Sequence, residues 1–208
     1  MKKLYALALL VALALTALAL TVPAPAAAKP ADDKASGINV GETVEDFSLP
    51  DTDGREHTLS SLKGQNGTVL IFISVQCPVS NAYNERMEKL AQDYQARGVN
   101  VVGINANVTE SPEAVKRHAA EKGLTFPILK DKGNKIADRL GALVTPEAFL
   151  LDTHNRLVYH GRIDNADPRR GNPVTSDDLR NAIEEMLAGR PVAKTEGKAF
   201  GCTIKRVS

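Results

Sequence analysis

The sequence predicts an α/β protein in which helices cover both faces of a central mixed sheet. Two observations lead to this fold class. Runs of apolar, β-branched residues, typical of strands buried on both faces, alternate along the chain with segments of helical periodicity. Residues 148–151 and 156–163 then form two neighbouring strand-like runs, which predict a hairpin and therefore an antiparallel part of the sheet.

The first elements lie before residue 107. Residues 47–49 predict a short strand, and the Asp-Thr-Asp-Gly of residues 51–54 has the composition of a tight turn. Residues 68–74 and 99–106 are dominated by apolar side chains and predict buried strands. Between them, apolar side chains at helical spacing predict one helix over residues 78–97.

The second half continues the alternation. Ser followed by Pro at residues 111–112 predicts a helix start, residues 126–129 a third buried strand, and residues 135–140 a further helix. A Ser-Asp-Asp cap opens the last amphipathic helix, which is predicted over residues 176–187. Beyond residue 189 no pattern predicts an element.

The N-terminus has the pattern of an export signal. Two lysines precede an apolar run over residues 4–22, and small residues follow it, so cleavage after Ala26 or Ala28 fits equally well. A run of this length can also anchor a chain in a membrane, which takes about 18 residues. Cleavage is favoured, because no positive charge flanks the small residues before Lys29. We therefore expect a secreted or periplasmic protein rather than a membrane-anchored one.

Length and charge suggest a single domain behind this leader. We expect a signal peptide over residues 1–26, a flexible linker over 27–37, a domain over 38–190 and a C-terminal tail over 191–208. The leader holds two of the 26 basic residues and none of the 25 acidic ones, so the rest of the chain has a net charge of −1. This balance argues against a nucleic-acid partner.

Cys77 is the most informative residue of the sequence. It follows the buried strand of residues 68–74 and directly precedes the helix predicted from Pro78. Backbone N–H groups and the positive end of a helix dipole stabilise a thiolate, and cysteines so placed commonly have pKa values of about 3.5–7.5. The alternative is an unreactive core cysteine. The context favours the reactive thiol, whose thiolate form attacks disulfides and peroxides.

The chain resembles the redoxin branch of the thioredoxin superfamily, also known as the AhpC/TSA or peroxiredoxin-like family. The resemblance covers about residues 40–163 and rests on four segments: residues 40–51, 59–64, 123–131 and 144–152. It implies a thioredoxin-like fold with an N-terminal strand extension. It also implies a cis peptide bond before Pro146, in a loop that packs beside Cys77 and pairs with substrate backbone. Thr145, Pro146, Pro78, Ser80 and Arg162 are the substrate-binding residues that this resemblance suggests.

Two departures from the family decide the subclass. Thioredoxin-type sites have a second cysteine where this chain has Ser80, and peroxiredoxins have a threonine where it has Ser74. The full peroxidase set is therefore missing. Residues 77–86 and 159–164 are most similar to a peroxiredoxin-like group that carries this single cysteine.

Cys202, 125 positions after Cys77, is the other cysteine of the chain. A lone thiolate needs a second thiol to resolve a mixed disulfide or a sulfenic acid. One hypothesis is that the tail folds back and Cys202 forms a reversible disulfide with Cys77. A permanent structural disulfide and a spectator cysteine are the two alternatives.

Other candidate residues are weaker. Tyr83 is expected in the core, and Arg86 in a solvated or structural role because it lies about 13 Å along the helix from Cys77. Arg162 is the arginine that could face the site. The four histidines show no metal-ligand spacing, so we expect no metal and no cofactor.

Together these observations predict an exported thiol-dependent oxidoreductase that uses Cys77, with Cys202 as the candidate resolving residue. Its expected partners are a protein disulfide or a peroxide as substrate and a thiol reductant as electron donor. A non-enzymatic thioredoxin-fold protein that binds a metal or a partner is the alternative.

Overall fold

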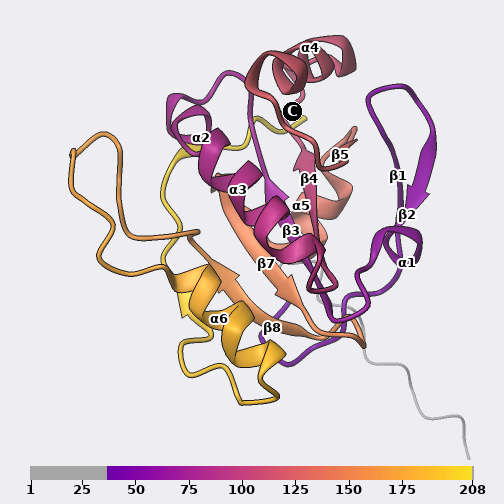
Figure 1. Cartoon of the computed structure of the whole chain (residues 1–208). Helices are drawn as coiled ribbons and strands as arrows, with labels where there is room; N and C mark the ends of the chain where they lie inside the picture. The colour runs from indigo at the N-terminus through magenta and orange to yellow at the C-terminus, as the bar shows by residue number, and fades with distance from the viewer. Residues whose placement is uncertain (1–36, 208) are drawn as a thin grey trace, which may run out of the picture. The chain divides into compact units, whose positions relative to one another are not determined.

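The computed structural model describes residues 37–207 (Figure 1). The predicted signal peptide over residues 1–26 and nearly all of the predicted linker over 27–37 lie outside the described residues. Within residues 37–207, no helix combines the length and the apolar character that a membrane crossing requires.

A six-stranded mixed sheet forms the centre of the fold, in the strand order β5-β4-β3-β7-β8-β9. β3 runs parallel to β4, and β4 runs parallel to β5, whereas β7 is antiparallel to both β3 and β8. The strands are β3 (Gly67–Phe72), β4 (Val99–Asn105), β5 (Ile128–Lys130), β7 (Glu147–Leu151), β8 (Leu157–Gly161) and β9 (Glu196–Gly197). The predicted mixed sheet and its terminal hairpin are therefore confirmed.

Helices cover both faces of this sheet, as predicted (Figure 1). α2, α3, α4 and α6 pack side chains into one hydrophobic cluster, which also contains Cys77, whereas α1 and α5 pack into a second cluster. The helices are α1 (Leu59–Leu62), α2 (Pro78–Ala82), α3 (Asn84–Gln95), α4 (Pro112–Lys122), α5 (Lys135–Leu140) and α6 (Asp178–Leu187). The two clusters form because successive residues of the buried strands point to opposite faces of the sheet.

Two short strand pairs complete the fold. β1 (Ser48–Pro50) and β2 (Glu56–Thr58) form an antiparallel hairpin ahead of the main sheet, which is the expected N-terminal extension. β6 (Val144–Thr145) pairs antiparallel with β10 (Cys202–Thr203). The second pair therefore brings the C-terminal tail against the segment before Pro146.

The single helix predicted over residues 78–97 is wrong, because the chain breaks at Tyr83 into α2 and α3. The Tyr83 side chain is buried, and its hydroxyl lies 2.7 Å from Asp164 and 2.8 Å from the Ala166 carbonyl oxygen. Its backbone N–H donates to the Ser80 carbonyl, three residues back, which closes α2 in a tight turn. The helix therefore breaks at a buried residue, although the helical pattern of the sequence continues through it.

The predicted cap of the last helix also differs in detail. Asp177 is the N-cap residue of α6, but its side chain makes no capping hydrogen bond. The hydroxyl of Ser176 instead binds the carboxylate of Asp178. That carboxylate also accepts hydrogen bonds from Arg162 and Lys194, so side-chain ion pairs replace the expected cap at the start of the helix.

The tail adds strands that the sequence does not predict. β9 runs parallel to β8, and Gly161 of β8 faces Gly197 of β9. Gly161 has a φ of +143°, and a Cβ at this position would collide with the Gly197 carbonyl group. Glycine is therefore required where the tail joins the edge of the sheet.

This close approach predicts that Gly161→Ala destabilises the fold by about 2–4 kcal/mol, since it adds a steric collision to an unfavourable backbone conformation. Gly133→Ala is the matched control, because Gly133 also has a positive φ of +89° but has open space around it. We expect the control to cost only about 1–2 kcal/mol. Urea unfolding of both variants measures the difference, and equal losses would contradict the close packing of β9 on β8.

Candidate active site

Cys77 lies where β3 leads into α2, as the N-cap residue of that helix. Its Sγ accepts a hydrogen bond from the Ser80 N–H at 3.3 Å, and Pro78 occupies the first helical turn. The residue is 2% exposed. The same N–H would stabilise negative charge on Sγ when the sulfur is a thiolate.

Cys77 forms a disulfide with Cys202, with 5.8 Å between the two Cα atoms. The bond joins residues that are 125 positions apart and uses both cysteines of the chain. The tail reaches this position by passing beside α2, as Figure 1 shows. Gly201 allows the approach, because a Cβ there would collide with the Thr145 carbonyl oxygen.

The loop before β7 forms the opposite wall of the site. The peptide bond between Thr145 and Pro146 is cis, which confirms the expectation from the resemblance. The Thr145 carbonyl oxygen lies 3.3 Å from Cys77 Sγ, and Thr145 pairs with Cys202 across the β6–β10 ladder. The tail therefore takes the position of an added strand on the cis-proline loop.

A buried carboxylate, Glu110, holds the loop that carries Cys77. It accepts hydrogen bonds from the Val75 and Gln76 N–H groups, both at 3.0 Å, and from the Ser74 hydroxyl at 2.6 Å. The Ser74 oxygen in turn accepts the Cys77 N–H at 3.1 Å. A single carboxylate thus fixes three consecutive residues and, through Ser74, the backbone of the cysteine.

Glu110 remains ionised although it is only 2% exposed. Burial raises the pKa of this carboxyl, but hydrogen bonds from Ser74, Asn105 and the Val75 and Gln76 N–H groups outweigh burial and hold the pKa below its usual value. The buried ammonium of Lys130 is bridged to Glu110 by Asn105, which accepts from Lys130 and donates to Glu110. Burial lowers the pKa of Lys130 below its usual value, and the nearby Glu110 charge offsets only part of this effect.

The hydrogen-bond network around Glu110 also holds the tail beyond Cys202. Asn107 donates to Glu110, and its side-chain oxygen accepts the Lys205 N–H at 2.7 Å. The Asn134 side chain accepts the Val207 N–H at 2.9 Å. The cysteine loop and the tail are therefore anchored to one hydrogen-bond network.

A second buried carboxylate, Glu147, holds the cis-proline loop. One of its oxygens accepts the N–H groups of Leu143 and Val144, at 2.7 and 3.0 Å, and the other lies 2.7 Å from His160 Nε2. The His160 ring stacks on Phe149 with 4.3 Å between centroids. Glu147 thus fixes the backbone that leads into β6.

The remaining predicted residues divide into two groups. Ser80 lies in the site, and its hydroxyl accepts the Ser74 N–H at 3.1 Å.

The two arginines form ion pairs away from the cysteines. Arg162 Nε donates to Asp178 at 2.5 Å. Arg86 pairs with Asp164 at 2.9 Å and stacks over the Tyr83 ring, and burial raises the pKa of Tyr83. The structure therefore brings Thr145, Pro146, Pro78 and Ser80 to the cysteine pair, whereas Arg162 belongs to the ion pairs of α6.

Sequence reasoning missed Glu110 and Glu147. A signal for Glu110 does exist: Asn105 is the last residue of β4, Asn107 and Glu110 follow it, and Ser74 follows the carboxyl end of β3. Parallel neighbouring strands end at the same edge of a sheet, which is where polar groups of α/β sites gather. Glu147 directly follows the predicted cis-proline and could have been found from that position.

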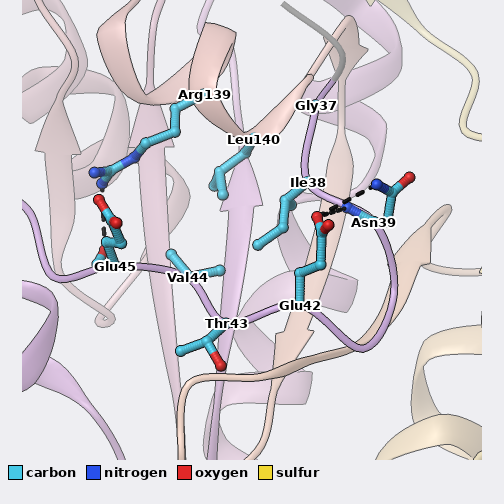
Figure 2. Close-up of a pocket in the computed structure, with 9 residues that line it drawn as sticks. All are labelled: Gly37, Ile38, Asn39, Glu42, Thr43, Val44, Glu45, Arg139 and Leu140. Carbon is cyan, nitrogen blue, oxygen red and sulfur yellow. Dashed lines mark hydrogen bonds between the residues drawn. The ribbon is translucent and has the colours of Figure 1, made fainter. Parts of the chain in front are cut away.

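A cavity of about 420 Å³ lies away from the cysteines, between the N-terminal segment and α5 (Figure 2). Three of its polar side chains bind one another or nearby backbone: Glu42 accepts from Asn39, and Arg139 donates to the Glu45 carbonyl. Within residues 37–207, no three histidine, cysteine or acidic side chains gather as metal ligands would. The cysteine pair is therefore the candidate active site.

A thioredoxin-like fold with a cysteine pair beside a cis-proline loop defines the class of thiol-dependent oxidoreductases. More particularly, the chain belongs to the AhpC/TSA family, whose model matches residues 40–160.

Individual proteins are similar to this chain in sequence or in structure. The thiol-disulfide oxidoreductase ResA of Halalkalibacterium halodurans is 35% identical over 119 residues, a match that spans 57% of this chain and 66% of that protein. A hypothetical protein from Sinorhizobium meliloti 1021 is 38% identical, with a TM-score of 0.78 over 83% of this chain and 97% of its own. An uncharacterised conserved protein from Geobacillus kaustophilus is 34% identical, with a TM-score of 0.76 over 80% and 92%.

The network around Glu110 predicts that Glu110→Gln destabilises the protein by about 3–5 kcal/mol at pH 7, because it breaks a buried ionic network. The folded-state pKa of Glu110 is depressed, so its contribution is present above the unfolded pKa of about 4.3 and is lost as the pH falls through the folded pKa. The stability gap between wild type and variant should therefore shrink below about pH 4.3.

Urea unfolding between pH 7 and pH 3 measures this gap. Glu121→Gln, on the exposed face of α4, is the control and should change stability by less than about 0.5 kcal/mol. A gap for Glu110→Gln that is small at pH 7, or that does not change with pH, would mean that Glu110 does not hold the cysteine loop as an anion.

Proposed function

We propose that this protein is an exported thiol-disulfide oxidoreductase in which Cys77 is the attacking thiolate and Cys202 the resolving thiol. The observation that carries the proposal is the Cys77–Cys202 disulfide, formed where the tail lies as a strand on the cis-proline loop. The relative from Halalkalibacterium halodurans, which is named a thiol-disulfide oxidoreductase, supports the same reaction.

The proposed reaction transfers two electrons from the cysteine pair to a substrate disulfide. The Cys77 thiolate attacks one substrate sulfur, forms a mixed disulfide and releases the other substrate sulfur as a thiolate. The Cys202 thiol loses its proton and attacks Cys77 Sγ, which forms the intramolecular disulfide and releases the second substrate thiolate. A dithiol reductant then returns the pair to its reduced state and is itself oxidised to a disulfide.

The contacts of the two sulfurs support this assignment of roles. Cys77 Sγ accepts the Ser80 N–H at the start of α2, and a charged acceptor strengthens such a bond. For Cys202, no backbone or side-chain donor to the sulfur is found within the described part of the chain. In the reduced protein, Cys77 should therefore be deprotonated more readily than Cys202. The same stabilisation makes Cys77 the better leaving group when the disulfide is reduced.

The anchoring of the tail supports a reversible disulfide. Beyond Cys202, Ile204 is 3% exposed, and Arg206 pairs with Asp138 at 2.7 Å. These contacts do not involve either sulfur, so they can hold Cys202 near Cys77 after reduction. A tethered thiol has a high effective concentration, which favours rapid closure of the disulfide.

Disulfide exchange is favoured over peroxide reduction by the groups around Cys77. The Ser74 hydroxyl, at the position of the peroxidase threonine, already donates to Glu110 at 2.6 Å. Arg86 and Arg162, which could otherwise polarise a peroxide, are held by Asp164 and Asp178. Thr145 and Pro146 are proposed to pair with the backbone of a protein substrate once reduction opens the pairing of Cys202 with Thr145.

Export and partners form part of the proposal. The leader pattern of residues 1–26 supports export, and a disulfide persists in oxidising compartments such as the periplasm or the cell exterior. The partners would be a protein disulfide as substrate and a thiol reductant as electron donor.

A thiol-releasing aromatic disulfide, 5,5′-dithiobis(2-nitrobenzoate), tests the roles of the two cysteines. Reduced wild type should release two equivalents of the coloured thiol and end as the Cys77–Cys202 disulfide. Cys202→Ser should release one equivalent and keep the mixed disulfide at Cys77. Cys77→Ser should react about tenfold more slowly at pH 6, because an ordinary thiol is mostly protonated there. Mass spectrometry without reductant identifies each product.

Two results would contradict the proposal. Equal rates for Cys77→Ser and Cys202→Ser would show that Cys77 is not the preferred nucleophile. Faster oxidation of the reduced protein by hydrogen peroxide than by the aromatic disulfide, at equal concentrations, would replace disulfide exchange with peroxide reduction.

A further inference from the structure

A cavity of about 570 Å³ lies beside the tail segment that leads to Cys202. The long loop between β8 and α6, orange at the left of Figure 1, projects from the sheet and supplies part of its wall. The lining residues that matter here are Arg162, Asp167, Arg169, Arg170, Lys198 and Phe200. The reaction proposed above uses none of these residues.

The cavity is electropositive on a chain that is nearly neutral. Of the described residues that line it, four are cationic and one is a carboxylate. Arg169 and Arg162 are neutralised by close ion pairs with Asp167 and Asp178. Arg170 is not, because its side chain is 82% exposed and its nitrogen lies 3.7 Å from an Asp167 oxygen that Arg169 already occupies. Such a local excess attracts anionic partners.

Lys198 adds to this excess. It is exposed, it lies four residues before Cys202 in the sequence, and it forms no ion pair within residues 37–207. The chain without its leader has a net charge of −1, so the positive charge at the cavity is a local feature rather than a property of the whole surface.

Phe200 connects this cavity to the disulfide. It lines the cavity, packs edge-to-face on Tyr83 with 6.3 Å between ring centroids, and precedes Cys202 by two residues. Two residues of extended chain span about 7 Å at most, so a group bound in the cavity lies within reach of Cys202. Cys202 is partly exposed whereas Cys77 is 2% exposed, so Cys202 carries the sulfur that an incoming thiolate can approach.

We propose that this cavity docks an acidic segment of the dithiol protein that reduces the Cys77–Cys202 disulfide. The inference rests on the proposed thiol-disulfide function and names the chemistry of its electron donor. A thiolate of the donor attacks Cys202 Sγ, forms a mixed disulfide and releases Cys77 as a thiolate. The second donor thiol loses its proton, attacks the mixed disulfide at the donor's own sulfur and releases Cys202, so that two electrons pass from the donor to the pair.

Three synthetic dithiol peptides test this docking. They share a Cys-Gly-Pro-Cys core and differ only in their flanks, which are acidic, neutral or basic. Each peptide is mixed with the oxidised protein at low ionic strength, the reaction is stopped with acid, and free protein thiols are counted by alkylation and mass spectrometry. We expect the acidic peptide to react about tenfold faster than the basic one, with the difference falling as salt is added, since charged clefts raise association rates by roughly 10–10³-fold and salt screens them.

Charge reversal at the cavity provides the specific test. In the Arg170→Glu/Lys198→Glu variant, the ratio of the acidic to the neutral rate constant should fall about tenfold, toward or below one. The Arg55→Glu/Lys89→Glu variant is the matched control, because it changes the net charge equally at exposed residues that do not line the cavity. Its ratio should stay close to that of wild type.

The outcomes separate this inference from the function on which it rests. If the neutral peptide reduces the disulfide but the cavity variant keeps the wild-type ratio, the docking site is overturned and the oxidoreductase function stands. An equal fall of the ratio in both variants would assign the effect to net charge and would also overturn the site. If no peptide reduces the disulfide, both the site and the proposed function fail.

Discussion

The antiparallel pairing of Cys202 with Thr145 is the interaction on which the site depends. It places the tail as a short strand on the cis-proline loop and brings Cys202 Sγ to Cys77 across 125 positions of sequence. The ladder has only two residues on each strand, so the disulfide contributes most of the free energy that holds Cys202 on the cis-proline loop. Closing a loop of this length stabilises a fold by about 5 kcal/mol in the chain-entropy account of disulfides. Reduction therefore loosens the tail without removing the contacts that hold Ile204 and Arg206.

Two buried carboxylates hold the two loops between which the disulfide forms. Glu110 fixes the backbone from Ser74 to Cys77, and Glu147 fixes the loop before the cis-proline. Both have hydrogen-bond partners, which keeps a buried carboxylate acceptable in a protein interior. Glu110 accepts from backbone N–H groups and the Ser74 hydroxyl, and Glu147 from backbone N–H groups while it also contacts the His160 ring. Both loops are held by groups other than the sulfurs. The disulfide can therefore break and form again while the two loops keep their positions.

The sequence predicted the fold best where burial imposes a pattern of apolar residues. The strands β3 and β4 are apolar over most of their length because both of their faces are covered, and the sequence predicted them closely. The break at Tyr83 was not predictable, since the helical spacing of apolar residues continues through it and its contact with Asp164 joins residues far apart in the sequence. β9 and β10 contain two residues each and are defined only by the strands they join. For the site, the sequence placed Cys77, and the family resemblance supplied the cis-proline loop. The roles of Glu110 and Glu147 required the fold, because ladder and loop geometry bring their partners together.

The central claim is that Cys77, once the disulfide is reduced, forms a thiolate that the start of α2 stabilises. The most direct measurement is the pH dependence of Cys77 alkylation in the reduced Cys202→Ser protein, where no second thiol competes. The account predicts an apparent pKa clearly below the value of about 8.5 for a free thiol. An apparent pKa at or above that value would show an ordinary buried cysteine, and the Ser80 N–H and the Glu110 network would then have no part in thiol chemistry.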